Sequence, residues 1–165
     1  MKIAKRPVSP LLLAIAALVG AGGFVHLREW LGSYRSLPSA VPGAAVVKVG
    51  FPVTAAISAV LAVVLVAMVL GRRDRSRATA VVLGVTAVFQ AVSLAALILS
   101  RTDSVFGWSE PAWTRGADQI RALEIGALIC LAQVAGLRAM MRSPRGATPI
   151  VGVSALPVMA PASAQ

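Results

Sequence analysis

The chain has 165 residues, of which 58% are hydrophobic and only 13% are charged, and its mean hydropathy is +0.82. Soluble globular proteins are far less apolar, so this composition excludes water as the solvent for most of the chain. The formal net charge of +10 would suggest nucleic-acid binding in a soluble domain. Here the basic residues flank apolar stretches and form no basic helix, so we expect no nucleic-acid partner.

The first apolar stretch covers about residues 9–25 and follows a basic N-terminus. Ser9 and Pro10 suit the N-cap and the first position of a helix. A basic start and the run LLLAIAALVG are also typical of a secretory signal peptide, so cleavage is the alternative for this segment. We expect an uncleaved anchor, and the later stretches predict a membrane protein in either case.

The sequence HLREWLGSYR follows this first stretch. Its large apolar residues recur at i, i+3, i+4 and i+7 and therefore share one helical face, namely Leu27, Trp30, Leu31 and Tyr34. Its charged residues occupy the other face, namely Arg28, Glu29 and Arg35. The pattern predicts an amphipathic segment along the outer membrane interface, with its two aromatic residues at headgroup level.

Three further stretches, about residues 51–70, 78–100 and 119–141, are long enough to span a bilayer as helices. Pro52 is expected in the first turn of the second span, where proline is tolerated, and Asp118 is expected to cap the fourth. Prolines and glycines separate the first two spans. The loop between the third and fourth spans holds Trp108 and Trp113, which suit the outer interface.

Basic residues predict the orientation of the spans. Four arginines in the short loop at residues 71–77 mark the cytoplasmic side, and ten of the 16 basic residues fall on that side in all. We therefore predict an all-α, up-and-down bundle of four transmembrane helices over residues 1–142, with both ends in the cytoplasm. Residues 143–165 are rich in Pro, Ala and Ser without a helical period, and we expect a disordered tail.

Polar residues inside the predicted spans are candidates for function, because such groups are costly in a bilayer. Glu124 is the ionisable residue that lies well inside, and Arg121 is placed at i, i+3 to pair with it, so a structural ion pair and a ligand or proton site are both open. In the third span Thr86, Gln90 and Ser93 share one side, and the second span offers Thr54 and Ser58. Helix packing is the commoner reason for such stripes.

The up-and-down order brings several of these residues into the outer half of the bundle. They form a candidate polar pocket that opens outward beneath the HLREWLGSYR segment, with six ligand-binding candidates: Glu124, Gln90, His26, Ser93, Thr54 and Ser58. The alternative is that these groups satisfy one another. A lone histidine near a membrane surface is more often partly exposed than part of a proton relay.

Metal and haem sites are not predicted. His26 is the single histidine, which excludes bis-histidine haem ligation within one chain, and the single cysteine, Cys130, is remote from it in the sequence. We expect no cofactor and find no spacing typical of a catalytic triad or a phosphate-binding loop.

The segment from His26 to Pro38 resembles a known pattern. Its His26, Leu27, Trp30, Tyr34, Arg35 and Pro38 match the HLxxWxxxYRxxP signature of small uncharacterised four-helix membrane proteins from bacteria, which are loosely DoxX-like in architecture. The resemblance implies a four-helix topology and candidate residues, but no reaction.

Three functions are open at this point. We favour a non-enzymatic accessory or structural component of the bacterial plasma membrane, which has the lipid bilayer as its surroundings and forms a homo-oligomer or joins a larger complex. The alternative is a protein that binds a small molecule or lipid in the outward pocket and is redox-linked, as in some DoxX-like proteins. Proton-coupled transport ranks third, because no ionisable path crosses the inner half of the predicted bundle.

Overall fold

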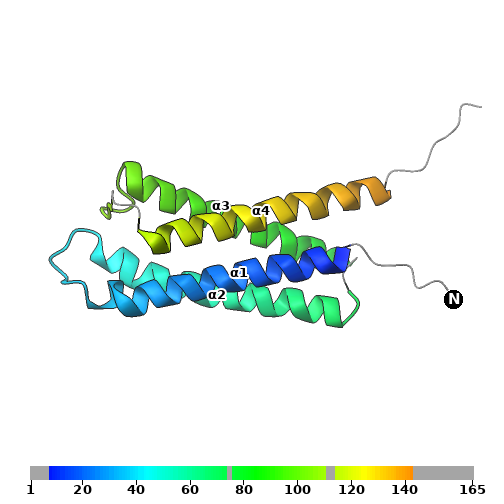
Figure 1. The fold of residues 1–165 in the computed structure, drawn as a ribbon, viewed down its shortest axis with the longest axis horizontal. Coiled ribbons are helices and arrows are strands. Elements are labelled where there is room, and N and C mark those ends of the chain that lie inside the picture. Colours follow the sequence, from blue (N-terminus) through cyan, green and yellow to red (C-terminus); the bar gives the residue numbers. More distant parts are fainter. Residues whose placement is uncertain (1–7, 74–75, 111–113, 143–165) are drawn as a thin grey trace, which may run out of the picture.

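Four long helices form the fold (Figure 1). The computed structural model describes residues 8–73, 76–110 and 114–142, and its helices are α1 (Val8–Gly32), α2 (Ala44–Leu70), α3 (Arg77–Thr102) and α4 (Arg115–Arg142). A short 3-10 helix, η1 (Tyr34–Ser36), follows α1. Each long helix is apolar and long enough to cross a membrane, which confirms the predicted all-α class with four helices of span length. Even α1 is about 38 Å long, against about 30 Å of hydrocarbon.

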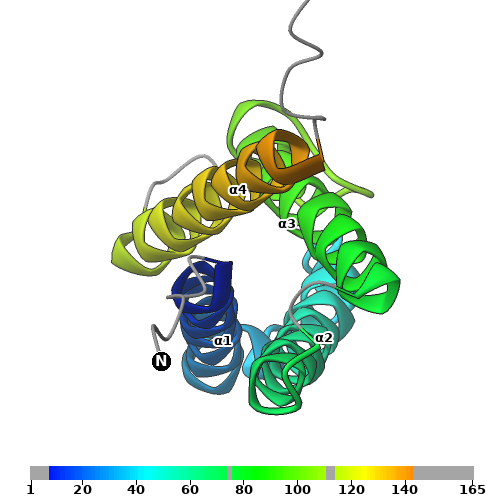
Figure 2. The same cartoon turned by 90° about the vertical axis from the view of Figure 1, so that its right-hand side faces the viewer.

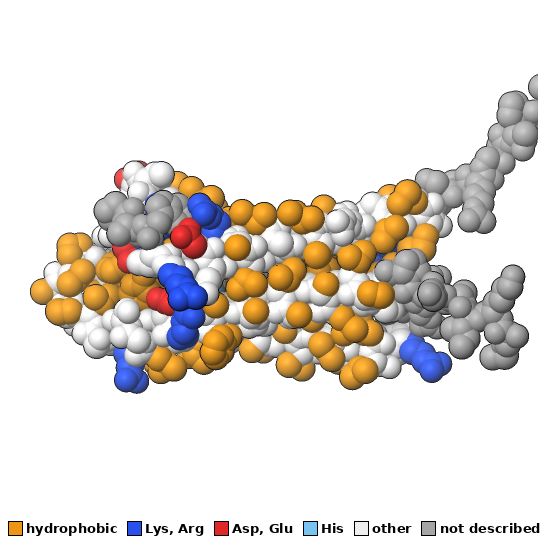
Figure 3. Space-filling view, viewed as in Figure 1, with side chains coloured by type: hydrophobic (Ala, Val, Ile, Leu, Met, Phe, Trp, Pro, Cys, Tyr) orange, Lys and Arg blue, Asp and Glu red, His pale blue; other side chains and the backbone are white. Residues whose placement is uncertain are grey.

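The two ends of the bundle differ in chemistry. At the end that we call the long-loop end, α1 joins α2 and α3 joins α4, whereas at the arginine end α2 turns into α3 and α4 stops (Figure 1). The acidic side chains that the structure describes all lie toward the long-loop end: Glu29, Asp103, Glu110, Asp118 and Glu124. Between the ends, hydrophobic side chains are spread along the bundle (Figure 3), as expected for a surface that faces lipid.

Helix α1 is the centre of the packing. It lies along both α2 and α4, α3 packs on α4, and α2 and α3 are barely in contact (Figure 2). The core is built from fully buried side chains of α1, such as Leu12 and Ile15, together with Leu65 of α2 and Val134 of α4. The side between α2 and α3 is therefore the least closed part of the bundle.

The first helix runs past its predicted span at residues 9–25. It ends at Gly32, inside the HLREWLGSYR segment, so most of this segment continues α1, and its place along the membrane interface stays a prediction. Leu27 and Leu31, on the predicted apolar face, are 39% and 45% exposed on the bundle. The helix stays on the bundle because His26, on another face, is buried against it.

The second helix begins at Ala44, before the predicted start at residue 51, so Pro52 lies inside it and not in its first turn. Proline has no N–H, and the carbonyl of Lys48, four residues earlier, therefore lacks its helical donor. The indole Nε1 of Trp30 donates a hydrogen bond to this carbonyl at 2.9 Å. A side chain of α1 thus replaces the backbone donor that α2 lacks, which explains how the helix tolerates the proline.

The other helices begin close to their predicted starts. Ser76 caps α3 by accepting a hydrogen bond from the backbone N–H of Thr79 at 3.1 Å. Helix α4 is capped by Thr114, whose hydroxyl accepts from the N–H of Ala117 at 3.2 Å, so the prediction that Asp118 caps it is wrong. Asp118 lies in the first turn, where a carboxylate is favourable to the helix dipole.

Helices α1 and α2 approach each other closely at Gly23. A Cβ atom added there would lie 2.7 Å from the Cβ of Ser58 and 3.2 Å from the carbonyl oxygen of Ala55. At the neighbouring Gly22 an added Cβ meets nothing within 4 Å. Close approach at small residues is the main way in which helices gain packing energy in a bilayer, where no hydrophobic effect drives them together.

We expect Gly23→Ala to destabilise the bundle by about 1–3 kcal/mol, because the methyl group overpacks the contact with α2. Gly22→Ala makes the same chemical change one residue away and should be neutral or stabilising by up to about 1 kcal/mol, as alanine favours helix. Thermal unfolding in detergent compares the two variants. Equal unfolding temperatures for both would contradict the close packing described for Gly23.

Orientation across the membrane remains a prediction, and the tail at residues 143–165 and Trp113 lie outside the described residues. The exposed side chains of Arg73 and Ser104 lie at opposite ends of the bundle. With Cys130→Ser as the parent, we expect a membrane-impermeant maleimide to label Ser104→Cys in intact cells and to label Arg73→Cys only after the cells are opened. Labelling of Arg73→Cys in intact cells would reverse the predicted topology.

Candidate functional site

A buried carboxylate joins three helices near the long-loop end. Glu124 of α4 is 3% exposed, and its Oε1 accepts a hydrogen bond of 2.5 Å from the hydroxyl of Ser93 on α3. The same oxygen lies 3.5 Å from Nε2 of His26 on α1. The predicted pairing of Glu124 with Arg121 is wrong, because Arg121 is exposed and its guanidinium bonds to Asp118 at 3.0 Å.

His26 is buried, with 8% of its surface exposed, although a partly exposed position was favoured from the sequence. Its ring meets the ring of Phe51 edge-on, with centroids 5.2 Å apart. Within the described residues, neither His26 nitrogen has a hydrogen-bond partner, and neither does Oε2 of Glu124. Buried polar atoms without partners are rare and costly in proteins, so they mark a place where another molecule is expected to bind.

A packed cap covers this cluster at the long-loop end. The ring of Tyr34 stacks at a tilt on Phe51, with centroids 4.3 Å apart, and meets Trp108 edge-on at 5.9 Å. The Tyr34 hydroxyl donates to Oε2 of Glu110 at 2.7 Å. Tyr34 is therefore 7% exposed and part of the cap, not a headgroup-level side chain on the surface.

Glu110 and Arg101 complete the cap. Nη1 of Arg101 lies 3.3 Å from Oε2 of Glu110, and the Arg101 side chain is only 4% exposed. The backbone N–H of Glu110 donates to the carbonyl of Ser100 at 2.8 Å, which folds the connection back over α3. Neither of these two residues was predicted for the site, because the sequence places Glu110 in a loop and Arg101 just outside a span.

A cavity of about 230 Å³ lies beside the cluster, between α2 and α3. Three of the six predicted ligand-binding residues line it, namely His26, Thr54 and Ser93, together with Phe51, Arg101 and Trp108. Val92 also lines the cavity and is 63% exposed, so the cavity opens sideways, toward the expected lipid.

The other three predicted ligand-binding residues lie around this cavity and do not line it. Glu124 is reached from the cavity through the hydroxyl of Ser93. Gln90 is buried one helical turn from Ser93, at 3% exposure. Ser58 is 2% exposed and packs against Gly23, so its role is the close approach of α1 and α2.

The charged residues at the end of α1 have a structural role. Nη2 of Arg28 donates to Glu29 at 2.7 Å and to the side chain of Gln119 on α4 at 2.9 Å. The Glu29 carboxylate lies against Gly116, in the first turn of α4, where the helix dipole favours negative charge. These contacts tie the end of α1 to the start of α4. Arg35 is exposed at the same end.

The arrangement can bind a neutral molecule that forms hydrogen bonds. His26 can donate or accept, and the Ser93 hydroxyl can accept a hydrogen bond while it donates to Glu124. The charge of Arg101 is balanced by Glu110. Among the residues that the structure describes, no three potential metal-ligating side chains come together.

Comparison of the chain with models of protein families, with curated proteins and with solved structures found no match. The resemblance of the segment that begins at His26 to a family signature therefore remains a prediction. The function has to be argued from the geometry of the site.

We expect Ser93→Ala to destabilise the bundle by about 1–3 kcal/mol, because it removes the donor to a buried carboxylate. Ser100→Ala on the same helix is the control, since the Ser100 hydroxyl donates only to the carbonyl of Leu97 in its own helix, at 2.7 Å. Thermal unfolding of the two variants in detergent measures the difference. The proposed role of Ser93 fails if both variants unfold at the same temperature.

Proposed function

We propose that this chain is a membrane protein that binds a small lipophilic ring compound in the cavity between α2 and α3. The observation that carries the proposal is the buried imidazole of His26, which lines the cavity and has no hydrogen-bond partner on either nitrogen among the described residues. A ligand that supplies a hydroxyl or carbonyl group would satisfy it.

The size and walls of the cavity support a single ring. An apolar cavity of about 150 Å³ holds benzene, so the larger volume of 230 Å³ here suits one ring with substituents. Phe51, Phe89 and Trp108 provide aromatic walls, and the polar groups are few. This combination of apolar walls and a few placed polar groups is typical of small-molecule sites.

The route of entry supports a ligand that dissolves in the bilayer. The cavity opens beside Val92 between two helices that barely touch, while Tyr34 and Glu110 close the long-loop end. Lipid-soluble phenols and quinones have the required ring and oxygen atoms. A redox-active ring, as the DoxX-like resemblance would imply, belongs to this class.

A second function is favoured by a different observation. The Glu124 carboxylate binds or approaches side chains from two other helices, so the cluster also holds the bundle together. A protein in which this is the whole role of the cluster would be a non-enzymatic accessory component of the membrane, with no ligand in the cavity. The two functions differ in whether a ring compound binds.

Tetramethylbenzoquinone and its hydroquinone are suitable probes, because they place an acceptor or a donor on the same ring. We expect the purified protein to bind at least one of them, as measured by equilibrium dialysis in detergent. His26→Phe keeps an aromatic ring but loses the nitrogens and should weaken binding about tenfold, the equivalent of one hydrogen bond of about 1.4 kcal/mol.

Val92→Trp should block the opening and also abolish binding, whereas Val88→Trp is the matched control. Val88 is 65% exposed on the same helix, one turn earlier, and does not line the cavity. Thermal unfolding verifies that each variant is folded. If neither probe binds, or if the His26 and Val92 variants bind as well as the unchanged protein, the ligand-binding function is rejected and the accessory role is favoured.

A further inference from the structure

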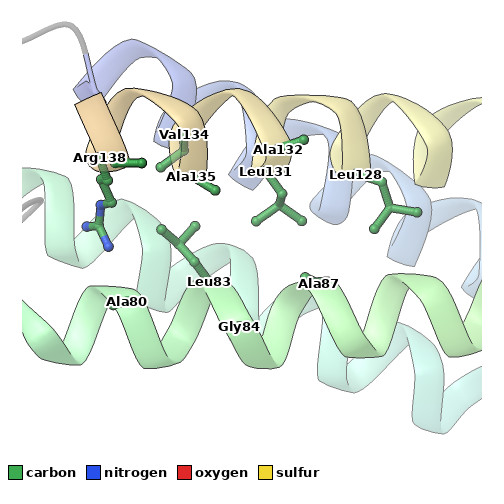
Figure 4. Close-up of a pocket in the computed structure, with 11 residues that line it drawn as sticks. Ala80, Leu83, Gly84, Ala87, Leu128, Leu131, Ala132, Val134, Ala135 and Arg138 are labelled. Carbon is green, nitrogen blue, oxygen red and sulfur yellow. The ribbon is translucent and has the colours of Figure 1, made fainter. Parts of the chain in front are cut away.

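A second cavity, of about 530 Å³, lies between α3 and α4 toward the arginine end (Figure 4). Its walls carry mostly small side chains, from Ala80, Gly84 and Ala87 on α3 and from Ala132 and Ala135 on α4. A Cβ atom added at Gly84 would meet nothing within 4 Å. The helices therefore leave a groove that the chain does not fill from its own described residues.

The length of the groove matches one leaflet of a bilayer. It is lined along α4 from Leu128 to Ala139, which at 1.5 Å per residue is about 16 Å. Half of a hydrocarbon core of about 30 Å is about 15 Å. An acyl chain of one leaflet has this length, whereas another transmembrane helix would need a groove along the whole bundle.

The groove ends at a positive charge. Arg138 is the charged residue that lines it, and its side chain extends from α4 toward α3 at the arginine end (Figure 4). Arg72 and Arg73 are exposed in the turn at the same end. The loop at this end, residues 71–77, holds four arginines against one aspartate, so this end is basic overall and attracts anions. Basic pockets between membrane helices bind the headgroups of anionic lipids.

We propose that the groove between α3 and α4 binds one anionic phospholipid, with an acyl chain along Gly84 and the phosphate at Arg138. The site is separate from the cavity beside His26 and does not depend on the function proposed for it. The apolar walls exclude a water-soluble anion as the occupant, because the groove would then be left unfilled. Binding therefore requires both parts of the ligand, the charged headgroup and the acyl chain.

The test uses the full chain reconstituted in nanodiscs with equal amounts of phosphatidylglycerol and phosphatidylcholine that carry the same acyl chains. Native mass spectrometry after gentle release counts the lipids that stay bound. We expect one phosphatidylglycerol to be retained in preference to phosphatidylcholine. Arg138→Gln should reduce this retention at least fivefold, and Arg73→Gln, which removes the same charge from the same end outside the groove, should not.

A second pair of variants tests the acyl chain. Gly84→Leu fills the groove and should also displace the lipid, whereas Gly136→Leu, at a glycine on α4 that does not line the groove, should leave retention unchanged. The helical circular dichroism and unfolding temperature of each variant establish that it is folded. Equal retention of both lipids, equal loss in the Arg73 variant, or unchanged retention in the Gly84 variant overturns the proposal. The proposal is also overturned if the protein is a dimer that Gly84→Leu dissociates, because a second copy of the chain would then fill the groove.

Discussion

A carboxyl group inside a lipid bilayer has to take its partners from the protein, because acyl chains offer none. In this chain the buried carboxyl group is that of Glu124, which accepts a hydrogen bond from Ser93 of α3 and lies near His26 of α1. The three helices are therefore fixed relative to one another at a single point. Helix α2 packs mainly on α1 and barely touches α3, and the space beside His26 lies between α2 and α3.

The two cavities described above both lie beside α3, which is sparsely packed. Only 17% of the most apolar part of α3 is buried, against 44% for α1. Toward the long-loop end the space beside α3 is bordered by aromatic rings and by the ion pair of Arg101 and Glu110. Toward the arginine end it is bordered by small side chains and Arg138. The same helix thus borders two sites of different chemistry, each within reach of the lipid.

Hydropathy was enough to predict four helices, because an apolar stretch long enough to span a bilayer has few stable structures other than a helix. It could not predict where the helices end, because Ala44 to Gly50 contains Lys48 and a glycine and yet continues α2. The inward polar side of α3 followed from the spacing of Gln90 and Ser93. The partners of Glu124 could not be predicted in the same way. The i, i+3 spacing allows a pair with Arg121 but does not show which residue the carboxylate faces across the bundle.

The hydrogen bond from Trp30 to the carbonyl opposite Pro52 also bears on how the protein is made. Helix α1 leaves the ribosome before α2, so the indole is already in place when the proline-containing turn enters the membrane. Signal cleavage near residue 25 would leave Trp30 on the mature chain but would remove most of α1, the helix that holds the indole against α2.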